Sequence, residues 1–114
     1  MKSMKLLLVI GACAAGAAWA QSVTVRGAGT GRCADYIEMR GLNNASDTYQ
    51  VGAWVQGFLS GHNAYAGGRN LAVLDVGSTL VELDRFCQAN REKAISDGAI
   101  AIAERLGAAK RAVR

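Results

Sequence analysis

The sequence has no proline, a single histidine and few aromatic residues. Aromatic residues make up 6% of it, whereas Ala, Leu, Val and Gly are plentiful. β-Sandwiches and barrels use many β-branched and aromatic strand residues, so this composition favours short helices that end at glycine. One histidine and the lack of any Cys-x-x-Cys spacing leave too few ligands for the usual four-ligand zinc site. The composition therefore predicts an all-α domain without a metal or another cofactor.

A large excess of charge of either sign is also missing. The 114 residues include 13 Lys and Arg against 9 Asp and Glu, which gives a formal net charge of +4. Basic residues are spread along the chain except at its end, where Lys110, Arg111 and Arg114 form a basic tail over residues 108–114. Because no basic stripe interleaved with aromatic residues is present, we expect no nucleic-acid partner.

Long hydrophobic runs are absent except at the start of the chain. Residues 1–20 have the pattern of a secretory signal peptide, with two lysines in Met1–Lys5, an apolar run over Leu6–Ala18 and small residues on both sides of Trp19. Cleavage is expected after Ala20, which places the mature protein in the periplasm. No run reaches the roughly 18 to 20 apolar residues that a membrane-spanning helix requires, so we expect no membrane span.

A second cleavage pattern overlaps the first. The segment Ile10–Cys13 resembles the lipobox that precedes the acylated cysteine of bacterial lipoproteins. Cleavage there would make a lipidated Cys13 the first residue of the mature protein, which mass spectrometry would detect as a large added mass. A lipoprotein therefore remains the alternative to an unmodified periplasmic protein.

Only three cysteines are present, and one of them lies in the signal peptide. The remaining pair, Cys33 and Cys87, would enter an oxidising compartment, where an even pair forms a disulfide by default. Two buried free thiols would suit a cytosolic protein better. The bond would close a loop of about 54 residues, for which the chain-entropy estimate is about 4 kcal/mol of stabilisation.

The first half of the mature chain is predicted to contain two helices after a flexible lead-in. Residues 21–32 contain three alternating glycines, so we expect them to be loosely attached. A short helix is predicted over Cys33–Met39, and residues 41–44 end it. The longest helix is predicted over Asp47–Tyr65. Its apolar residues recur at helical spacing and form a predicted protein-binding face with His62 in line: Val51, Trp54, Val55, Phe58 and Tyr65.

Glycines interrupt this long helix. Gly57 and Gly61 lie four residues apart on one face, and a glycine inside a helix costs about 1 kcal/mol relative to alanine. One explanation is that a neighbouring helix or a partner subunit approaches closely at this face. The other is that a helix held by the rest of the fold tolerates the glycines.

The third helix is predicted to follow an ordered loop over Leu71–Val76. Thr79 and Glu82 have the spacing of a capping box, which would begin the helix at Thr79. Three residues of this helix then fall on one side and face the core: Leu80, Leu83 and Cys87.

The fourth helix is predicted to be capped by Asn90 and to end at Gly107. Small and apolar residues repeat along it at helical spacing: Ile95, Gly98, Ala99, Ile102 and Leu106. The mature chain is therefore predicted to be one four-helix domain over residues 33–107, closed by the Cys33–Cys87 disulfide.

The complete pattern resembles the HdeA/HdeB group of periplasmic acid-stress chaperones and their relatives. The resemblance rests on Cys33 near the start of a short helix, the aromatic and glycine-containing helix Tyr49–Gly61, and the segments Leu74–Val76 and Cys87–Asn90. It covers about residues 33–106, which is most of the mature chain.

This resemblance implies a small helical domain that is dimeric near neutral pH, loosens in acid and holds unfolding proteins without nucleotide. Without residues 1–20 the chain has 11 Lys and Arg against 9 Asp and Glu, a net charge of 11 − 9 = +2. In strong acid the carboxylates become neutral while the basic residues and His62 are charged, so the charge approaches 11 + 1 = +12. The resulting self-repulsion would expand the fold.

A second group of proteins has a similar size and composition. These are the helical, disulfide-containing immunity proteins that block peptidoglycan amidases delivered by type VI secretion. The present chain is rich in arginine and glycine, whereas the characterised acid chaperones are rich in lysine. A specific inhibitor of a cell-wall hydrolase is therefore the alternative function.

Catalysis is not expected from this sequence. An enzyme needs convergent groups, such as a nucleophile with its base or a pair of carboxylates. The single His62 lies on the apolar stripe and is predicted to pack at a helix edge, and both mature cysteines are expected to be oxidised. Asp75 and Asp84 are predicted to be capping or surface groups. The expected function is therefore the binding of another protein, either an unfolded one or a specific periplasmic partner.

Overall fold

A computed structural model of the chain describes residues 24–65, 70–72 and 74–112. The predicted signal peptide and Cys13 lie outside the described residues. The described part of the chain forms one 3-10 helix and four α-helices: η1 (Gly27–Thr30), α1 (Cys33–Gly41), α2 (Ala45–Tyr65), α3 (Val76–Ala89) and α4 (Ile95–Ala112). The prediction of an all-α, four-helix fold is confirmed. No helix within these ranges has both the length and the apolar character needed to cross a membrane.

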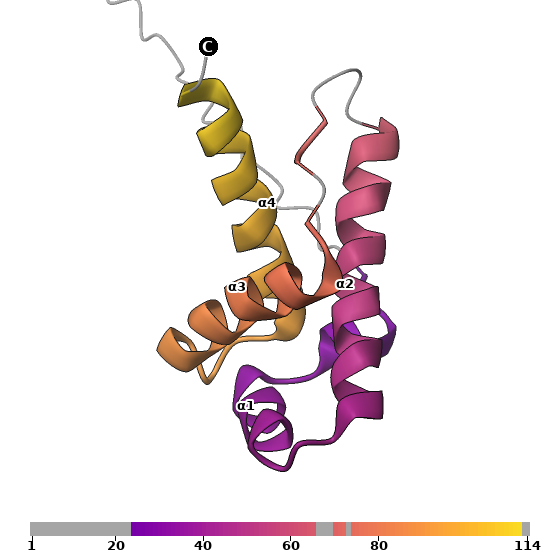
Figure 1. The fold of residues 1–114 in the computed structure, drawn as a ribbon, viewed down its shortest axis with the longest axis vertical. Coiled ribbons are helices and arrows are strands. Elements are labelled where there is room, and N and C mark those ends of the chain that lie inside the picture. Colours follow the sequence, from indigo (N-terminus) through magenta and orange to yellow (C-terminus); the bar gives the residue numbers. More distant parts are fainter. Residues whose placement is uncertain (1–23, 66–69, 73, 113–114) are drawn as a thin grey trace, which may run out of the picture.

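Helix α3 lies at the centre of the fold. It crosses between α2 and α4 and contacts both of them as well as α1, whereas the far ends of α2 and α4 diverge (Figure 1). Its buried side is formed by Thr79, Leu80, Leu83 and Cys87. The positions predicted for the core of α4 are all buried: Ile95, Gly98, Ala99, Ile102 and Leu106. Burial of each large aliphatic side chain contributes about 1.5–3 kcal/mol to stability.

A disulfide joins the first residue of α1 to the last turn of α3, as predicted. The Cys33 and Cys87 sulfurs are 2.05 Å apart, and neither residue has exposed surface. The connection between α3 and α4 satisfies the first N–H groups of α1, because Cys33 N donates to Lys93 O at 2.8 Å and Ala34 N donates to Arg91 O at 2.9 Å. The covalent bond and these hydrogen bonds therefore fix α1 at the same corner of the fold.

The lead-in is attached more firmly than its glycines predicted. The 3-10 helix η1 lies against α2, where Trp54 Nε1 donates to Arg26 O at 2.9 Å. A Cβ atom added to Gly29 would overlap the Trp54 ring, so only glycine allows this contact. Further along, Ile95 N donates to Gly31 O at 2.8 Å. The expectation of a loose lead-in is therefore wrong for residues 27–32, because their glycines serve close packing.

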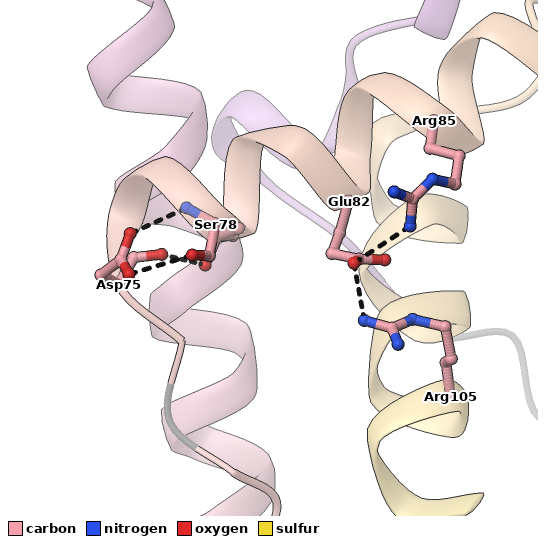
Figure 2. Close-up of polar contacts among 6 residues, drawn as sticks. Asp75, Ser78, Glu82, Arg85 and Arg105 are labelled. Atoms are coloured by element: carbon pink, nitrogen blue, oxygen red, sulfur yellow. Dashed lines mark hydrogen bonds and ion pairs between the residues drawn. The ribbon is translucent and has the colours of Figure 1, made fainter. Parts of the chain in front are cut away.

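Helix α3 begins earlier than the capping box predicted. Its N-cap is Asp75, whose Oδ1 accepts from Ser78 N at 2.8 Å while its Oδ2 accepts from Ser78 Oγ at 3.0 Å (Figure 2). Thr79 is inside the helix and is fully buried, with its hydroxyl donating to Asp75 O at 2.9 Å. Glu82 instead accepts from Arg85 at 3.2 Å and from Arg105 of α4 at 2.8 Å (Figure 2). The capping role predicted for Thr79 and Glu82 is therefore wrong.

Helix α4 also has different ends from those predicted. Asn90 caps the C-terminus of α3, because its Nδ2 donates to Phe86 O at 2.9 Å. Helix α4 begins at Ile95, where Asp97 Oδ2 accepts from Ala94 N at 3.0 Å. It then continues through Gly107 to Ala112. Part of the segment predicted as a basic tail is therefore helical.

The close approaches at glycine occur at other positions than predicted. A Cβ added to Gly52 would lie 3.3 Å from the Leu80 side chain, and one added to Gly98 would lie 2.7 Å from that of Leu83. Gly57 and Gly61 have no other side chain or helix of the described chain within 4 Å of the Cβ position. No neighbouring helix of the chain approaches them, so close packing there stays a prediction only for a partner subunit.

Candidate binding groove between two helices

The apolar stripe predicted on α2 divides into two parts. Val51 and Val55 are buried in the core, and Val55 has no exposed surface. Trp54 is partly buried and stacks on Phe58 at a ring-centroid distance of 5.9 Å. Tyr65, at the end of the helix, is 92% exposed. Because the valines are covered within the single chain, separation of a dimer would not expose them, and only the second part of the stripe is accessible.

The accessible part of α2 forms one wall of a groove of about 600 Å³. The other wall is α4, and the floor is Leu71, which lies in the connection between α2 and α3. The groove lies between residues 58–65 of α2 and residues 100–111 of α4, and these two helices diverge toward their C-terminal ends (Figure 1). Its lining comprises Phe58, His62, Tyr65, Leu71, Ile100, Ala103, Glu104, Gly107 and Arg111.

Leu71 forms the floor because two side chains of α2 hold its segment. Asn63 Oδ1 accepts from Leu71 N at 2.8 Å, and Asn63 Nδ2 donates to Leu71 O at 3.3 Å. Gln56 Nε2 donates to Leu74 O at 2.8 Å. The Leu71 side chain is buried, so it closes the bottom of the groove with apolar surface.

The wall formed by α4 combines an apolar row with two charged side chains. Ala103 is buried, whereas Ile100 is 42% exposed and offers its side chain to the groove. A Cβ added to Gly107 would lie 3.5 Å from Arg111 Nη1 and 3.6 Å from Leu71 Cδ2. The Arg111 guanidinium therefore lies over Gly107 and beside the apolar floor.

The charged groups gather at the outer end of the groove. Lys110 Nζ donates to Asn70 O at 2.5 Å, which places this ammonium next to the floor residue Leu71. Arg111 lines the groove, and Glu104 is the one carboxylate among the described residues that line it. The last turn of α4 therefore places one cation in the lining and a second, Lys110, beside it.

An apolar groove with a few charged groups at its rim is the usual form of a site that binds a peptide or a small molecule. Comparisons with protein-family models, with curated proteins and with solved structures found no match for this chain. The resemblance to the HdeA/HdeB group therefore stays a prediction. The groove between α2 and α4 is therefore the candidate functional site.

A separate polar cluster joins α1 to α3. Tyr36 Oη donates to Asp84 Oδ1 at 2.6 Å, and Arg40 donates to the same carboxylate through Nε at 2.9 Å and Nη2 at 2.7 Å. Partial burial acts to raise the pKa of Asp84, but the hydrogen bonds from Arg40 and Tyr36 and the charge of Arg40 outweigh it, so this pKa lies below its usual value. Burial and the contact with Asp84 raise the pKa of the Tyr36 phenol far above its ordinary value.

The structure corrects the prediction made for Asp84 and confirms the one made for Asp75. Asp84 is neither a capping nor a surface group, because its carboxylate is only 23% exposed and connects two helices. Asp75 is a capping group, as expected. Among the described residues, no three His, Cys, Asp or Glu side chains lie close enough together to hold a metal ion.

The structure assigns the predicted site residues to different roles. Phe58 and Tyr65 line the groove, together with His62, which is exposed instead of packed at a helix edge. The contributions of Leu71 and α4 to the groove were not predicted from the sequence. The exposed Ile100 was the available signal, because it is a large aliphatic residue outside the core positions of a helix that is otherwise regularly amphipathic.

Proposed function

We propose that this chain is an exported periplasmic protein that binds a segment of another protein in the groove between α2 and α4. The observation that supports the proposal is an apolar groove that the described residues leave open, with Phe58 and the highly exposed Tyr65 on one wall. Aromatic side chains that are accessible beside a concave apolar surface are typical of protein-binding sites. The proposal is tested by measuring whether unfolded or helical polypeptides bind to the purified protein.

The proposed mode of action is that of an acid-stress chaperone that works without nucleotide. Helices α1 and α3 are joined by the disulfide, which acid does not break. An ion pair of Glu82 and Arg105 links α4 to α3, and such a pair is much weaker than a covalent bond. The end of α4 also carries Lys110 and Arg111, which repel other cations as the acidic groups become neutral. We therefore expect α4 to loosen first and to open the groove further.

The chaperone hypothesis is tested by the aggregation of an unrelated protein in acid, followed by light scattering. The protein in stoichiometric excess should suppress aggregation at about pH 3, and Ile100→Glu should weaken the protection. Val81→Glu is the matched control, because Val81 is 53% exposed on α3 and does not line the groove. Full aggregation in the presence of excess protein would contradict the hypothesis.

The second candidate is a specific inhibitor of a periplasmic enzyme, such as a cell-wall hydrolase. It is favoured by the fixed floor of the groove, because the hydrogen bonds between Asn63 and Leu71 give it a defined shape in the folded state. A preformed site binds one partner with little loss of conformational entropy. Affinity capture from periplasmic extract at neutral pH should then retain a single enzyme in a one-to-one complex. Retention of no enzyme would argue against this candidate.

A further inference from the structure

The walls of the groove restrict the kind of polypeptide that it can bind. Both walls are α-helices, whose backbone groups are used within each helix between its ends. An extended segment would therefore find few backbone partners there and would lose its hydrogen bonds to water. A helix satisfies its own backbone groups, so it can place an apolar face in the groove without this loss.

The length of the groove matches about three turns of such a helix. Its wall on α4 runs from Ile100 to Arg111, a distance of about 16 Å at 1.5 Å per residue. A bound helix would place three or four apolar side chains at i, i+3, i+4 and i+7 against Phe58, Leu71 and Ile100.

The charges at the rim select the sign of the partner. Arg111 lies beside the floor, and Lys110 is held next to it through Asn70. Among the described lining residues the charge of Arg111 is balanced by that of Glu104, so Lys110, bound to Asn70 next to Leu71, gives this end of the groove an excess of one positive charge. We infer that the groove binds an acidic amphipathic helix of another protein, with apolar side chains on the floor and carboxylates at Arg111 and Lys110. This inference rests on the proposed binding in the groove and adds the chemical class of the partner for the folded protein at neutral pH, where the carboxylates are charged.

The test uses two synthetic helical peptides with the same leucines at i, i+3, i+4 and i+7. One carries glutamates on both sides of the apolar face, and the other carries lysines at the same positions. Fluorescence anisotropy at neutral pH should show that the acidic peptide binds about tenfold more tightly, which is the ratio expected from reversing two exposed charge pairs. Added salt should reduce this preference.

Variants of the protein separate the charge preference from the groove itself. Arg111→Glu should weaken the acidic peptide and strengthen the basic one, whereas Arg91→Glu, at an exposed position between α3 and α4, should change neither. Ile100→Glu should weaken both peptides, and Val81→Glu should weaken neither. Equal binding of both peptides, unaffected by Arg111→Glu but lost in Ile100→Glu, would overturn the acidic preference and leave the groove as the site. Binding of neither peptide to the unchanged protein would overturn the inference together with the proposed function.

Discussion

Replacement of Asp84 by asparagine should destabilise the protein at neutral pH but not in strong acid. The carboxylate accepts one hydrogen bond from Tyr36 and two from Arg40, at 2.6, 2.9 and 2.7 Å. An asparagine keeps one accepting oxygen but turns an NH₂ group toward the guanidinium, so one hydrogen bond is replaced by a contact between two donors. The substitution also removes the charge that pairs with Arg40.

The loss should be about 2 kcal/mol, since a hydrogen bond to a charged group contributes roughly 1.5–3 kcal/mol. For a domain of this size, that corresponds to a decrease of roughly 8–16 °C in the melting temperature. The pKa of Asp84 is lowered in the folded protein. Its contribution is therefore complete above the pKa of an unfolded aspartate, about 3.9, and is lost as the pH falls through the lower pKa of the folded state.

Urea unfolding of Asp84→Asn and of the unchanged protein, followed by circular dichroism, measures this difference as a function of pH. The difference in the free energy of unfolding should be constant from neutral pH down to about pH 4 and should disappear in stronger acid. Asp35→Asn is the control and should have little effect, because Asp35 lies on α1, the helix that carries Tyr36 and Arg40, but forms an exposed pair with Arg32 at 3.3 Å. A difference that is absent at neutral pH, or one of equal size in strong acid, would refute this account of the cluster.

Three further predictions concern the disulfide and the glycines. Reduction of the disulfide should lower the free energy of unfolding by about 4 kcal/mol. Because both cysteines are fully buried, the reduction should be slow unless denaturant is present, and mass spectrometry after alkylation measures its rate. Gly29→Ala should displace the Trp54 ring, and the overpacking should lower the free energy of unfolding by about 1–3 kcal/mol. Trp54 is the sole tryptophan in protein without the signal peptide, so the fluorescence emission should shift to the red, and unchanged emission would contradict the overlap. Gly57→Ala and Gly61→Ala should each raise the free energy of unfolding by about 1 kcal/mol, because the added methyl groups meet open space. If a second copy of the chain approaches this face, the same two variants should also dissociate the dimer in size-exclusion chromatography. A lower free energy of unfolding in a monomeric variant would show that the added methyl group does not meet open space.

Helical periodicity and the number of cysteines were sufficient to predict the core. The apolar repeat of α4 is buried at each predicted position, and the disulfide forms between Cys33 and Cys87. Both predictions depend on local spacing or on the redox state of the compartment, which do not require knowledge of the tertiary structure.

Helix ends were predicted less well because several residues of one segment can act as caps. Asp75 and Thr79 are both good N-cap residues, and the capping-box spacing of Thr79 and Glu82 favoured the later start of α3. Gly107 has the residue type of a helix C-terminus, but α4 continues past it, where Lys110 donates to Asn70 O. The selection among these caps is made by tertiary contacts.

The groove could not be predicted because it depends on the angle between two helices far apart in the sequence. Periodicity predicted one stripe that contains Val55, Phe58 and Tyr65, and of these three Phe58 and Tyr65 line the groove. It contained no information on where α4 ceases to cover that stripe. The attachment of the lead-in was predicted wrongly for the same reason, because the Trp54 ring that requires Gly29 lies far from Gly29 in the sequence.

The apolar stripe of α2 is longer than the core that it covers, and this difference separates stability from binding. Val55 is completely buried, so Val55→Ala should leave a cavity and lower the free energy of unfolding by about 2 kcal/mol. Tyr65 is on the same stripe but is 92% exposed, so Tyr65→Ala should leave stability almost unchanged and weaken the binding of a helical peptide. Urea unfolding and peptide anisotropy measured on both variants test this division. If Tyr65→Ala lowered stability as much as Val55→Ala, the outer part of the stripe would belong to the core, and the groove would lose its role as a binding surface.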